Sequence, residues 1–352
     1  MIDLGLRAPT EDSVTSSGDT HNFGLRTLSS GSVISKSRTV YWEWFLQDPR
    51  SPLWQHQGFS FINQILLPNK ISRDKKSMTA LKSVQIDEQN ISKLSYTGLG
   101  RLIALCQALG ISDLHYENVL ATEGPDNHLR INPIDIESIG NKFVLPSQTG
   151  LITKSSHSDY STVGLHFLYT LKDDLRLSLI PQIVSGYLET FSDLTGKHYE
   201  DQLPIEDCEP VRIILRPTRG YYNYLEHKVG STNFLPEEII QLERGDIPYF
   251  FRLPNSTEIR WYTDPNGSSA ILAPTDYLKR HQAKVKTFES IADVLEQSDS
   301  IKLAKSGALQ IVLSLCTGLK QLNFPQMGGL KISLGENHLE IGYNNEVFST
   351  KI

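Results

Sequence analysis

The sequence predicts an α+β fold with a small β-rich N-terminal lobe, residues 1–92, and a larger, mainly helical lobe, residues 93–352. The length of 352 residues exceeds that of an average domain and is enough for two lobes with cores of their own. Short segments of alternating polarity near the N-terminus predict strands. Later segments, with apolar residues three and four positions apart, predict helices.

Composition narrows the class of protein. The 34 Lys and Arg residues against 40 Asp and Glu residues give a net charge of −6, which excludes a generic basic nucleic-acid binder. No apolar run reaches the ~18 residues of a membrane span, and the chain begins without the basic region of a secretion signal. Cys106, Cys208 and Cys316 are too scattered for a disulfide framework or a zinc cluster. We therefore expect a cytoplasmic protein that binds neither membrane nor nucleic acid.

The predicted N-terminal lobe begins with a β-hairpin over residues 24–38, which turns at Gly31 and carries Lys36 on its second strand. The apolar segment 41–46 can be a strand or a buried helix, and we favour the helix. Residues 69–90 are polar and mixed in charge, which predicts an exposed connection between the lobes.

The predicted C-terminal lobe opens with a helix whose apolar positions run over 99–109 and which stops at Gly110. A polar loop, a turn over 122–127 and a strand within 129–136 follow. The remaining elements predicted are a strand or buried segment at 211–215, helices within 276–297 and 305–319, and a β-meander over 330–352.

The most informative segment is the polar loop at Asp113. Asp113 precedes Asn118 by five positions, which is the spacing of the catalytic base and the metal-binding Asn in the kinase catalytic loop. Phosphoryl transfer needs a carboxylate to orient the acceptor hydroxyl and hard oxygen ligands for Mg²⁺. Asp113 serves the first need, and Asn118 with the strand-borne Asp135 serves the second. Taken alone, the string from Asp113 to Asn118 is also consistent with an ordinary polar loop after a capped helix. The additional acid at Asp135 favours phosphotransfer with ATP and Mg²⁺.

A kinase also places a strand-borne lysine on the phosphates, and Lys36 is the best candidate. A strand lysine by itself is usually solvated, and no Gly-x-Gly-x-x-Gly loop accompanies this one. A second Asp-x-His string, at Asp19 and His21, does not fit the catalytic loop because position 24 is Gly rather than Asn. Taken alone, it predicts an N-terminal turn.

Six strings carry a family resemblance, and they occur in this order: Gly18-Asp-Thr-His-Asn-Phe-Gly24, Lys36-Ser-Arg38, Asp113-Leu-His-Tyr-Glu-Asn118, Ile134-Asp-Ile-Glu137, Val211-Arg-Ile-Ile-Leu-Arg-Pro-Thr218 and Gly245-Asp-Ile-Pro-Tyr-Phe250. In this order they resemble the dehydratase domain of class II lanthipeptide synthetases. That family has a lipid-kinase-like fold. It phosphorylates Ser and Thr of a ribosomally made precursor peptide with ATP and then eliminates the phosphate, leaving dehydroalanine or dehydrobutyrine.

The resemblance implies two sets of site residues. The phosphotransfer set is Lys36 on the ATP phosphates, Asp113 and His115 in the transfer step, Asn118 and Asp135 on Mg²⁺, and Glu137 beside that metal site. The elimination set is Arg212 with Thr218, and Asp19 with His21. An arginine suits elimination because it neutralises charge on the departing phosphate, and the near-neutral pKa of histidine suits a base. The string Gly245-Asp-Ile-Pro is more typical of a structural turn than of a catalytic element.

The chain departs from the family pattern in three ways. Ser35-Lys36-Ser37-Arg38 stands where Tyr-Lys-Pro-Arg is usual, so the turn imposed by proline is lost. Asp19 lies close to the start, so we expect leader-peptide recognition to differ. No Cys-His-Gly string provides a zinc site, so we expect no cyclase domain and no thioether ring formation. The expected partners are a precursor peptide and a separate cyclase or other peptide-modifying enzyme.

Two other functions are consistent with these residues. One is a kinase of a peptide or small hydroxylated molecule without elimination, and the other is a catalytically silent partner that presents a peptide to another enzyme. The phosphotransfer residues argue against the silent partner. The dehydratase and the kinase both require Lys36 and the residues from Asp113 to Asp135 to meet at one nucleotide–metal centre.

Overall fold

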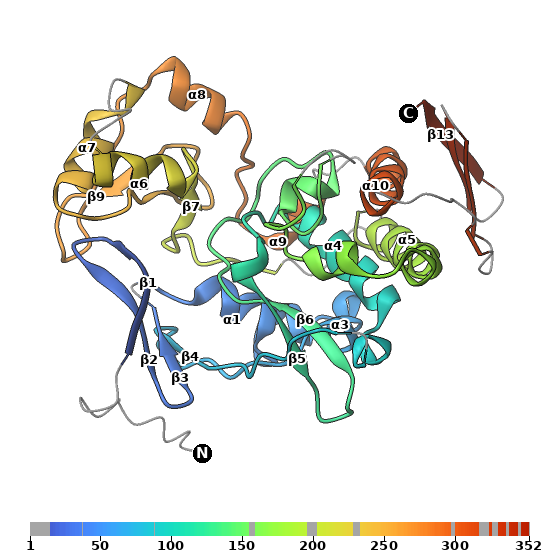
Figure 1. The fold of residues 1–352 in the computed structure, drawn as a ribbon. Helices are drawn as coiled ribbons and strands as arrows, with labels where there is room; N and C mark the ends of the chain where they lie inside the picture. The colour runs from blue at the N-terminus through green and yellow to red at the C-terminus, as the bar shows by residue number, and fades with distance from the viewer. Residues whose placement is uncertain are drawn as a thin grey trace. The chain divides into compact units, whose positions relative to one another are not determined.

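The computed structural model describes residues 15–36, 38–87, 89–154, 159–195, 203–227, 233–296, 300–316, 324–325, 330–335, 338–343 and 346–351. Over these residues the chain is a mixed α+β protein with a β-rich N-terminal region (Figure 1). It divides into two compact units. Unit 1 comprises Met1–Ser51, Pro68–Leu81 and Ile205–Glu289, and unit 2 comprises Pro52–Leu67, Lys82–Pro204 and Ser290–Ile352.

The division differs from the expected single boundary after residue 92, because unit 1 joins segments that are far apart in sequence. The indole Nε1 of Trp42 donates to Pro210 O at 2.9 Å, and Thr39 Oγ1 donates to Glu209 Oε2 at 2.6 Å. The Trp42 ring also meets Phe288 edge to face at 6.2 Å. These contacts join residues 205–289 to Thr39 and to Trp42 in the N-terminal part of unit 1.

Unit 1 contains two four-stranded antiparallel sheets, ordered β1-β2-β3-β4 and β10-β9-β8-β7. The strands are β1 (Thr15–His21), β2 (Leu25–Ser30), β3 (Val33–Ser35), β4 (Ser77–Thr79), β7 (Val211–Ile213), β8 (Phe250–Arg252), β9 (Arg260–Tyr262) and β10 (Ser269–Ile271). The helices are α1 (Tyr41–Gln47), α6 (Thr218–His227), α7 (Pro236–Glu243) and α8 (Asp276–Gln282).

The structure confirms the predicted hairpin, since Ser30 pairs with Val33 across a turn in which Gly31 has a φ of 56°. Lys36 follows β3 directly rather than lying within it. The helix favoured for residues 41–46 is also confirmed as α1.

The prediction of an exposed connection over residues 69–90 is wrong for its first part. β4 pairs with β3 there, and Ile71 and Met78 are only 1% and 2% exposed. The few apolar residues in this segment complete the sheet of unit 1, while the neighbouring lysines dominate its composition. One of several changes between the two units falls inside this segment, between Leu81 and Lys82.

Unit 2 is mainly helical. Its α-helices are α2 (Pro52–Gln55), α3 (Ile62–Ile65), α4 (Tyr96–Ala108), α5 (Asp173–Thr195), α9 (Ile291–Glu296) and α10 (Ser300–Leu315). Its 3₁₀ helices are η2 (Gln57–Phe59), η3 (Ile91–Lys93), η4 (Tyr116–Asn118), η5 (Pro146–Thr149) and η6 (His166–Thr170). Its strands are β5 (Val119–Glu123) and β6 (Leu129–Pro133), which form a hairpin, and β11 (Leu330–Leu334), β12 (His338–Tyr343) and β13 (Glu346–Lys351), which form the predicted meander.

The core of unit 2 lies where α4 and α5 pack side by side, with α10 against α5 (Figure 1). Glycines make this close approach possible, because a Cβ at Gly100 would overlap the backbone of Ile183 and one at Gly186 would overlap the backbone of Thr97. α4 begins at Ser95, whose side chain accepts from Gly98 N, and the chain leaves it through Gly110 at a φ of 64°, as the sequence predicts.

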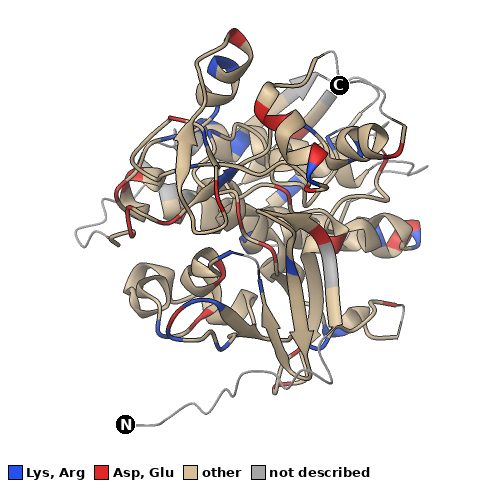
Figure 2. Cartoon of the chain, turned by 90° about the vertical axis from the view of Figure 1, so that its left-hand side faces the viewer, with Lys and Arg blue, Asp and Glu red and all other residues tan. Residues whose placement is uncertain are grey.

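Among the described residues, no helix has both the length and the apolar character needed to cross a bilayer. Acidic and basic residues are interspersed along the ribbon (Figure 2), in keeping with the nearly balanced composition.

Candidate functional site

Unit 1 holds a buried cluster of two cations on one carboxylate. Lys36 Nζ donates to Glu43 Oε1 at 2.8 Å, while Arg38 donates to Oε1 from Nη2 at 2.7 Å and to Oε2 from Nη1 at 3.1 Å. The Glu43 side chain is 0% exposed, and those of Lys36 and Arg38 are 9% and 7% exposed. The carboxylate therefore fixes the position of the lysine that the sequence assigns to ATP phosphates.

The sequence predicted Lys36 but not Glu43. Glu43 lies on α1, a helix in which six of the seven residues are buried. The signal was present in the string Tyr41-Trp-Glu-Trp-Phe, because a lone acid inside an aromatic run that is buried must find a cationic partner.

A second site of unit 1 surrounds His21, the last residue of β1. The ring nitrogen Nδ1 lies 2.8 Å from Ile247 O. Because a carbonyl oxygen only accepts, Nδ1 carries the proton, and in the neutral ring Nε2 is then the basic nitrogen. The His21 ring meets Tyr249 edge to face at 5.9 Å.

The same tyrosine contacts the predicted arginine of the elimination set. The Arg212 guanidinium carbon on β7 lies 5.5 Å from the centre of the Tyr249 ring, and Tyr249 is 3% exposed. Tyr249 thus contacts both His21 and Arg212, although these two residues are 191 positions apart in the sequence. Sequence reasoning did not single out Tyr249.

The other two residues of the elimination set are Asp19, which is bonded to helix α6, and Thr218, which is part of that helix. The hydroxyl of Tyr222 donates to Asp19 Oδ1. Thr218 is the first residue of α6 and precedes Tyr222 by four positions, so both lie on the same face of that helix. The structure therefore places the predicted pair Asp19 and His21 on one strand, with Asp19 bonded to α6 and His21 against Tyr249.

The phosphotransfer loop belongs to unit 2. Leu114 is fully buried and its N–H donates to Thr149 O at 2.9 Å, which anchors the loop in the core. Asp113 has a φ of 66°, a left-handed conformation that Asp tolerates better than most residues. Its Oδ1 lies 3.9 Å from His115 Nε2, and the two side chains are 37% and 36% exposed. The reactive groups of this loop thus face solvent from a fixed backbone.

Asn118 links the two halves of the predicted metal set. Its Nδ2 donates to Asp113 O at 2.8 Å, and its main-chain O accepts from Ile134 N at 2.9 Å, which brings Asp135 next to it. Because Nδ2 is used by the loop, Oδ1 is the atom of this side chain that can ligate a cation. A carboxylate and an amide oxygen are the hard ligands that suit Mg²⁺, so the donor set fits.

Glu137 follows in the same segment. Asp135 and Glu137 are partly exposed, whereas Ile136, between them, is 0% exposed. That Glu137 supports the metal site stays a prediction.

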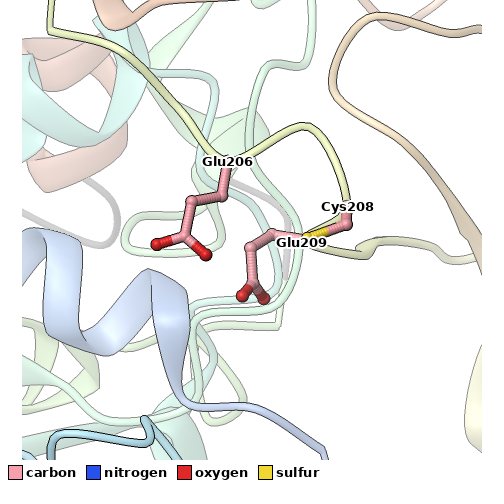
Figure 3. A group of neighbouring side chains, drawn as sticks. All are labelled: Glu206, Cys208 and Glu209. Atoms are coloured by element: carbon pink, nitrogen blue, oxygen red, sulfur yellow. The ribbon is translucent and has the colours of Figure 1, made fainter.

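A third group, which the sequence did not predict, lies on the loop before β7, where Glu206, Cys208 and Glu209 have ligand atoms within 4.8 Å of one another (Figure 3). Lys75 Nζ forms an ion pair with Glu206, and Thr39 donates to Glu209 at 2.6 Å. Burial raises the pKa of Glu209, and the hydrogen bond from Thr39 and the charge of Lys75 only partly offset this. The contacts with Lys75 and Thr39 give both Glu206 and Glu209 a structural role within unit 1.

No known family model matches the chain, and no curated protein matches it. The ten predicted residues divide evenly between the units. Unit 1 contains Lys36, Asp19, His21, Arg212 and Thr218, and unit 2 contains Asp113, His115, Asn118, Asp135 and Glu137. That the two sets act on one nucleotide and one peptide stays a prediction.

Proposed function

We propose that the chain is an ATP- and Mg²⁺-dependent peptide dehydratase, with a kinase-like two-lobed architecture, that phosphorylates Ser or Thr and then eliminates the phosphate. The observation that carries the proposal is the shared contact of His21 and Arg212 with Tyr249, because it combines a basic nitrogen with a cation for a leaving phosphate. A kinase that stops at phosphorylation has no use for this pair.

For the phosphorylation half, the Lys36–Glu43 pair lies in unit 1 and the Asp113 loop lies in unit 2. The Lys36–Glu43 contact at 2.8 Å has the form of the lysine–glutamate ion pair that orients the ATP phosphates in protein kinases. Asp113 would orient the Ser or Thr hydroxyl and accept its proton. The hydroxyl oxygen then forms a bond to the γ-phosphorus, the bond from that phosphorus to the β–γ bridging oxygen breaks, and ADP leaves.

Asn118 Oδ1 and the Asp135 carboxylate would hold Mg²⁺, with Glu137 in support. When bound, Mg²⁺ supplies positive charge against the phosphate oxygens. The role of Asn118 in the loop is to keep its amide oxygen in place through the Nδ2 bond to Asp113 O.

The elimination half uses unit 1. With its proton on Nδ1 held by Ile247 O, His21 has Nε2 as the nitrogen that can take the α-proton of the phosphorylated residue. The electron pair of the Cα–H bond forms the Cα–Cβ double bond, and the Cβ–O bond breaks. Phosphate leaves as an anion, and Arg212 would stabilise the charge on its oxygens.

The elimination half can be tested without knowing the natural peptide. The wild type should convert a synthetic phosphoserine peptide to the dehydroalanine peptide, with release of inorganic phosphate and loss of one phosphoric acid by mass spectrometry. Arg212→Ala should lower this rate by ~10²-fold or more. Arg260→Ala, on β9 of the same sheet, is the control and should keep wild-type activity.

The phosphorylation half needs ATP, Mg²⁺ and a Ser/Thr-rich peptide, such as one encoded beside the gene. Loss of one water per modified residue supports the dehydratase, and a stable phosphopeptide from the wild type contradicts the elimination half. Calorimetry with ATP, with and without Mg²⁺, separates both enzymes from the silent binding partner, which would give no metal-dependent heat.

A further inference from the structure

The turn that follows His21 has an unusual backbone. Asn22, Phe23 and Gly24 are three successive residues with φ of 48°, 70° and 81°. Glycine adopts this left-handed region readily, but a side chain as large as that of phenylalanine is strained in it. Such a conformation persists only where surrounding contacts hold it, and it often lies at a functional site.

Asp246, which lies more than 220 positions later in the sequence, provides those contacts. Its carboxylate accepts from Phe23 N at 2.9 Å and from Gly24 N at 2.8 Å, and it also accepts from Arg244 Nε at 2.7 Å. The Asp246 side chain is 0% exposed. The Arg244 guanidinium carbon lies 3.7 Å from the centre of the Phe23 ring, so it covers the strained residue. One buried carboxylate thus holds two N–H groups of the turn and the cation that packs on it.

The neighbours of Asp246 hold the strand that leads into this turn. Ile247 N donates to Thr20 O at 2.8 Å, and Thr20 Oγ1 donates to Gly245 O at 2.9 Å. Ile247 O accepts from the His21 ring. Three successive residues, Gly245, Asp246 and Ile247, therefore contact the chain on both sides of His21.

We propose that Asp246 is a positioning residue that sets the tautomer of His21, by holding the 22–24 turn so that Nδ1 faces Ile247 O. The inference concerns the geometry of the free protein, and its meaning for elimination rests on the proposed function. Asp246 acts through His21 and touches no reacting atom. The sequence predicts a structural turn at residues 245–248. In this proposal, residues of that turn hold the segment around His21 in place.

Asp246→Asn tests the proposal directly. The amide oxygen can replace only one of the two carboxylate oxygens, so one of the two turn N–H groups then faces the amide NH₂, which cannot accept from it. Asp48→Asn is a matched control in the same unit, because Asp48 is 1% exposed and accepts from two backbone N–H groups, of Arg50 and Ile71, and from an arginine side chain. Both variants remove similar bonds, but only one removes them beside His21.

The measurement is ¹⁵N NMR of the imidazole rings in labelled protein at a pH where the histidines are neutral, with His21→Gln used to assign the His21 signals. In the wild type and in Asp48→Asn, Nδ1 should carry the proton. In Asp246→Asn, the two nitrogen shifts of His21 should move toward each other as the tautomers mix. If Asp246→Asn keeps the Nδ1-protonated ring, the proposal is overturned.

Arg244→Gln covers the case in which Asp246→Asn does not fold. It keeps the carboxylate and its two turn bonds but removes the ion pair and the cover of Phe23, and it should shift the His21 signals in the same direction by a smaller amount. Signals identical to those of the wild type in Arg244→Gln would then count against the proposal.

An activity measurement separates this inference from the proposed function. On the phosphoserine peptide, Asp246→Asn should eliminate ~10-fold to 10²-fold more slowly than Asp48→Asn. A tautomer change in a protein that never eliminates phosphate would leave the positioning role intact and contradict the dehydratase. Equal elimination rates in the two variants, with unchanged His21 signals, would contradict the positioning role alone.

Discussion

The two units hold their reactive groups in different ways. In unit 1 the Lys36–Arg38–Glu43 cluster is at most 9% exposed, and His21 donates from Nδ1 to a carbonyl at 2.8 Å. In unit 2 the Asp113 and His115 side chains are more than a third exposed and lie 3.9 Å apart. Unit 1 therefore presents its groups largely buried, whereas unit 2 presents Asp113 and His115 partly exposed to solvent.

The two histidines make the difference concrete. Around His115, Nδ1 accepts from Glu117 N at 3.3 Å, which requires the proton on Nε2, while Asn118 Nδ2 lies 3.2 Å from Nε2 and favours a lone pair there. These neighbours do not select one tautomer, whereas Ile247 O selects one for His21. A base needs a defined lone pair before it meets the substrate, but a residue that contacts a phosphate can adjust on binding.

The largest effect expected is that of Glu43→Gln. The substitution leaves the buried cations Lys36 and Arg38 without their shared negative charge, and it should lower the free energy of unfolding by about 3–5 kcal/mol. Urea unfolding followed by circular dichroism measures this. Glu123→Gln, which breaks the exposed Lys93–Glu123 pair at 2.7 Å, is the control and should cost about 1 kcal/mol or less. Equal losses for the two variants would contradict the comparison of the units.

Asp113→Asn should have the opposite profile. Asn tolerates the left-handed φ of 66°, so the free energy of unfolding should change by only about 0.5 kcal/mol. If Asp113 takes the hydroxyl proton, phosphorylation should slow by ~10²-fold to 10⁴-fold. Asp113→Ala adds backbone strain and should cost a further ~1 kcal/mol at the same loss of activity. An Asp113→Asn variant that phosphorylates at the wild-type rate would remove Asp113 from the mechanism.

The smallest effect concerns Glu209, a buried acid of unit 1. Burial raises the pKa of Glu209, so its contribution to stability is present below the pKa of the unfolded chain and is lost as the pH rises through the folded pKa. Glu209→Gln keeps an acceptor for Thr39 and should raise the Tm by about 2 °C at pH 7. The gain should shrink toward pH 4 in thermal unfolding scans. A gain that grows on acidification would contradict the raised pKa.

Local features of the chain were predictable because they depend on residues that are close in sequence. The hairpin turn at Gly31, the helix stop at Gly110 and the β5–β6 hairpin after the Asp113 loop all follow from turn residues and short apolar patterns. The spacing of Asp113 and Asn118 was also visible, and the structure joins them by a hydrogen bond of 2.8 Å.

Composition misled where a few apolar residues decide the structure. Ile71 and Met78 are buried in the sheet of unit 1, but they lie in a segment in which lysines predominate. The pattern therefore indicated a solvated connection over residues 69–90. Two side chains are too few to give a period, although they are enough to bury one edge of a sheet.

By itself, the sequence determined the types of chemistry available: a lysine predicted on a strand, an acid and an amide five positions apart, and a histidine two positions after an acid. Only the tertiary structure decided which of these groups are held. Glu43 on α1 forms ion pairs with Lys36 and Arg38, and Asp246 supports the turn after His21 from more than 220 positions away. The physical reason is that tautomers, ion pairs and strained turns depend on what a group contacts, and those contacts come from segments that no local pattern connects.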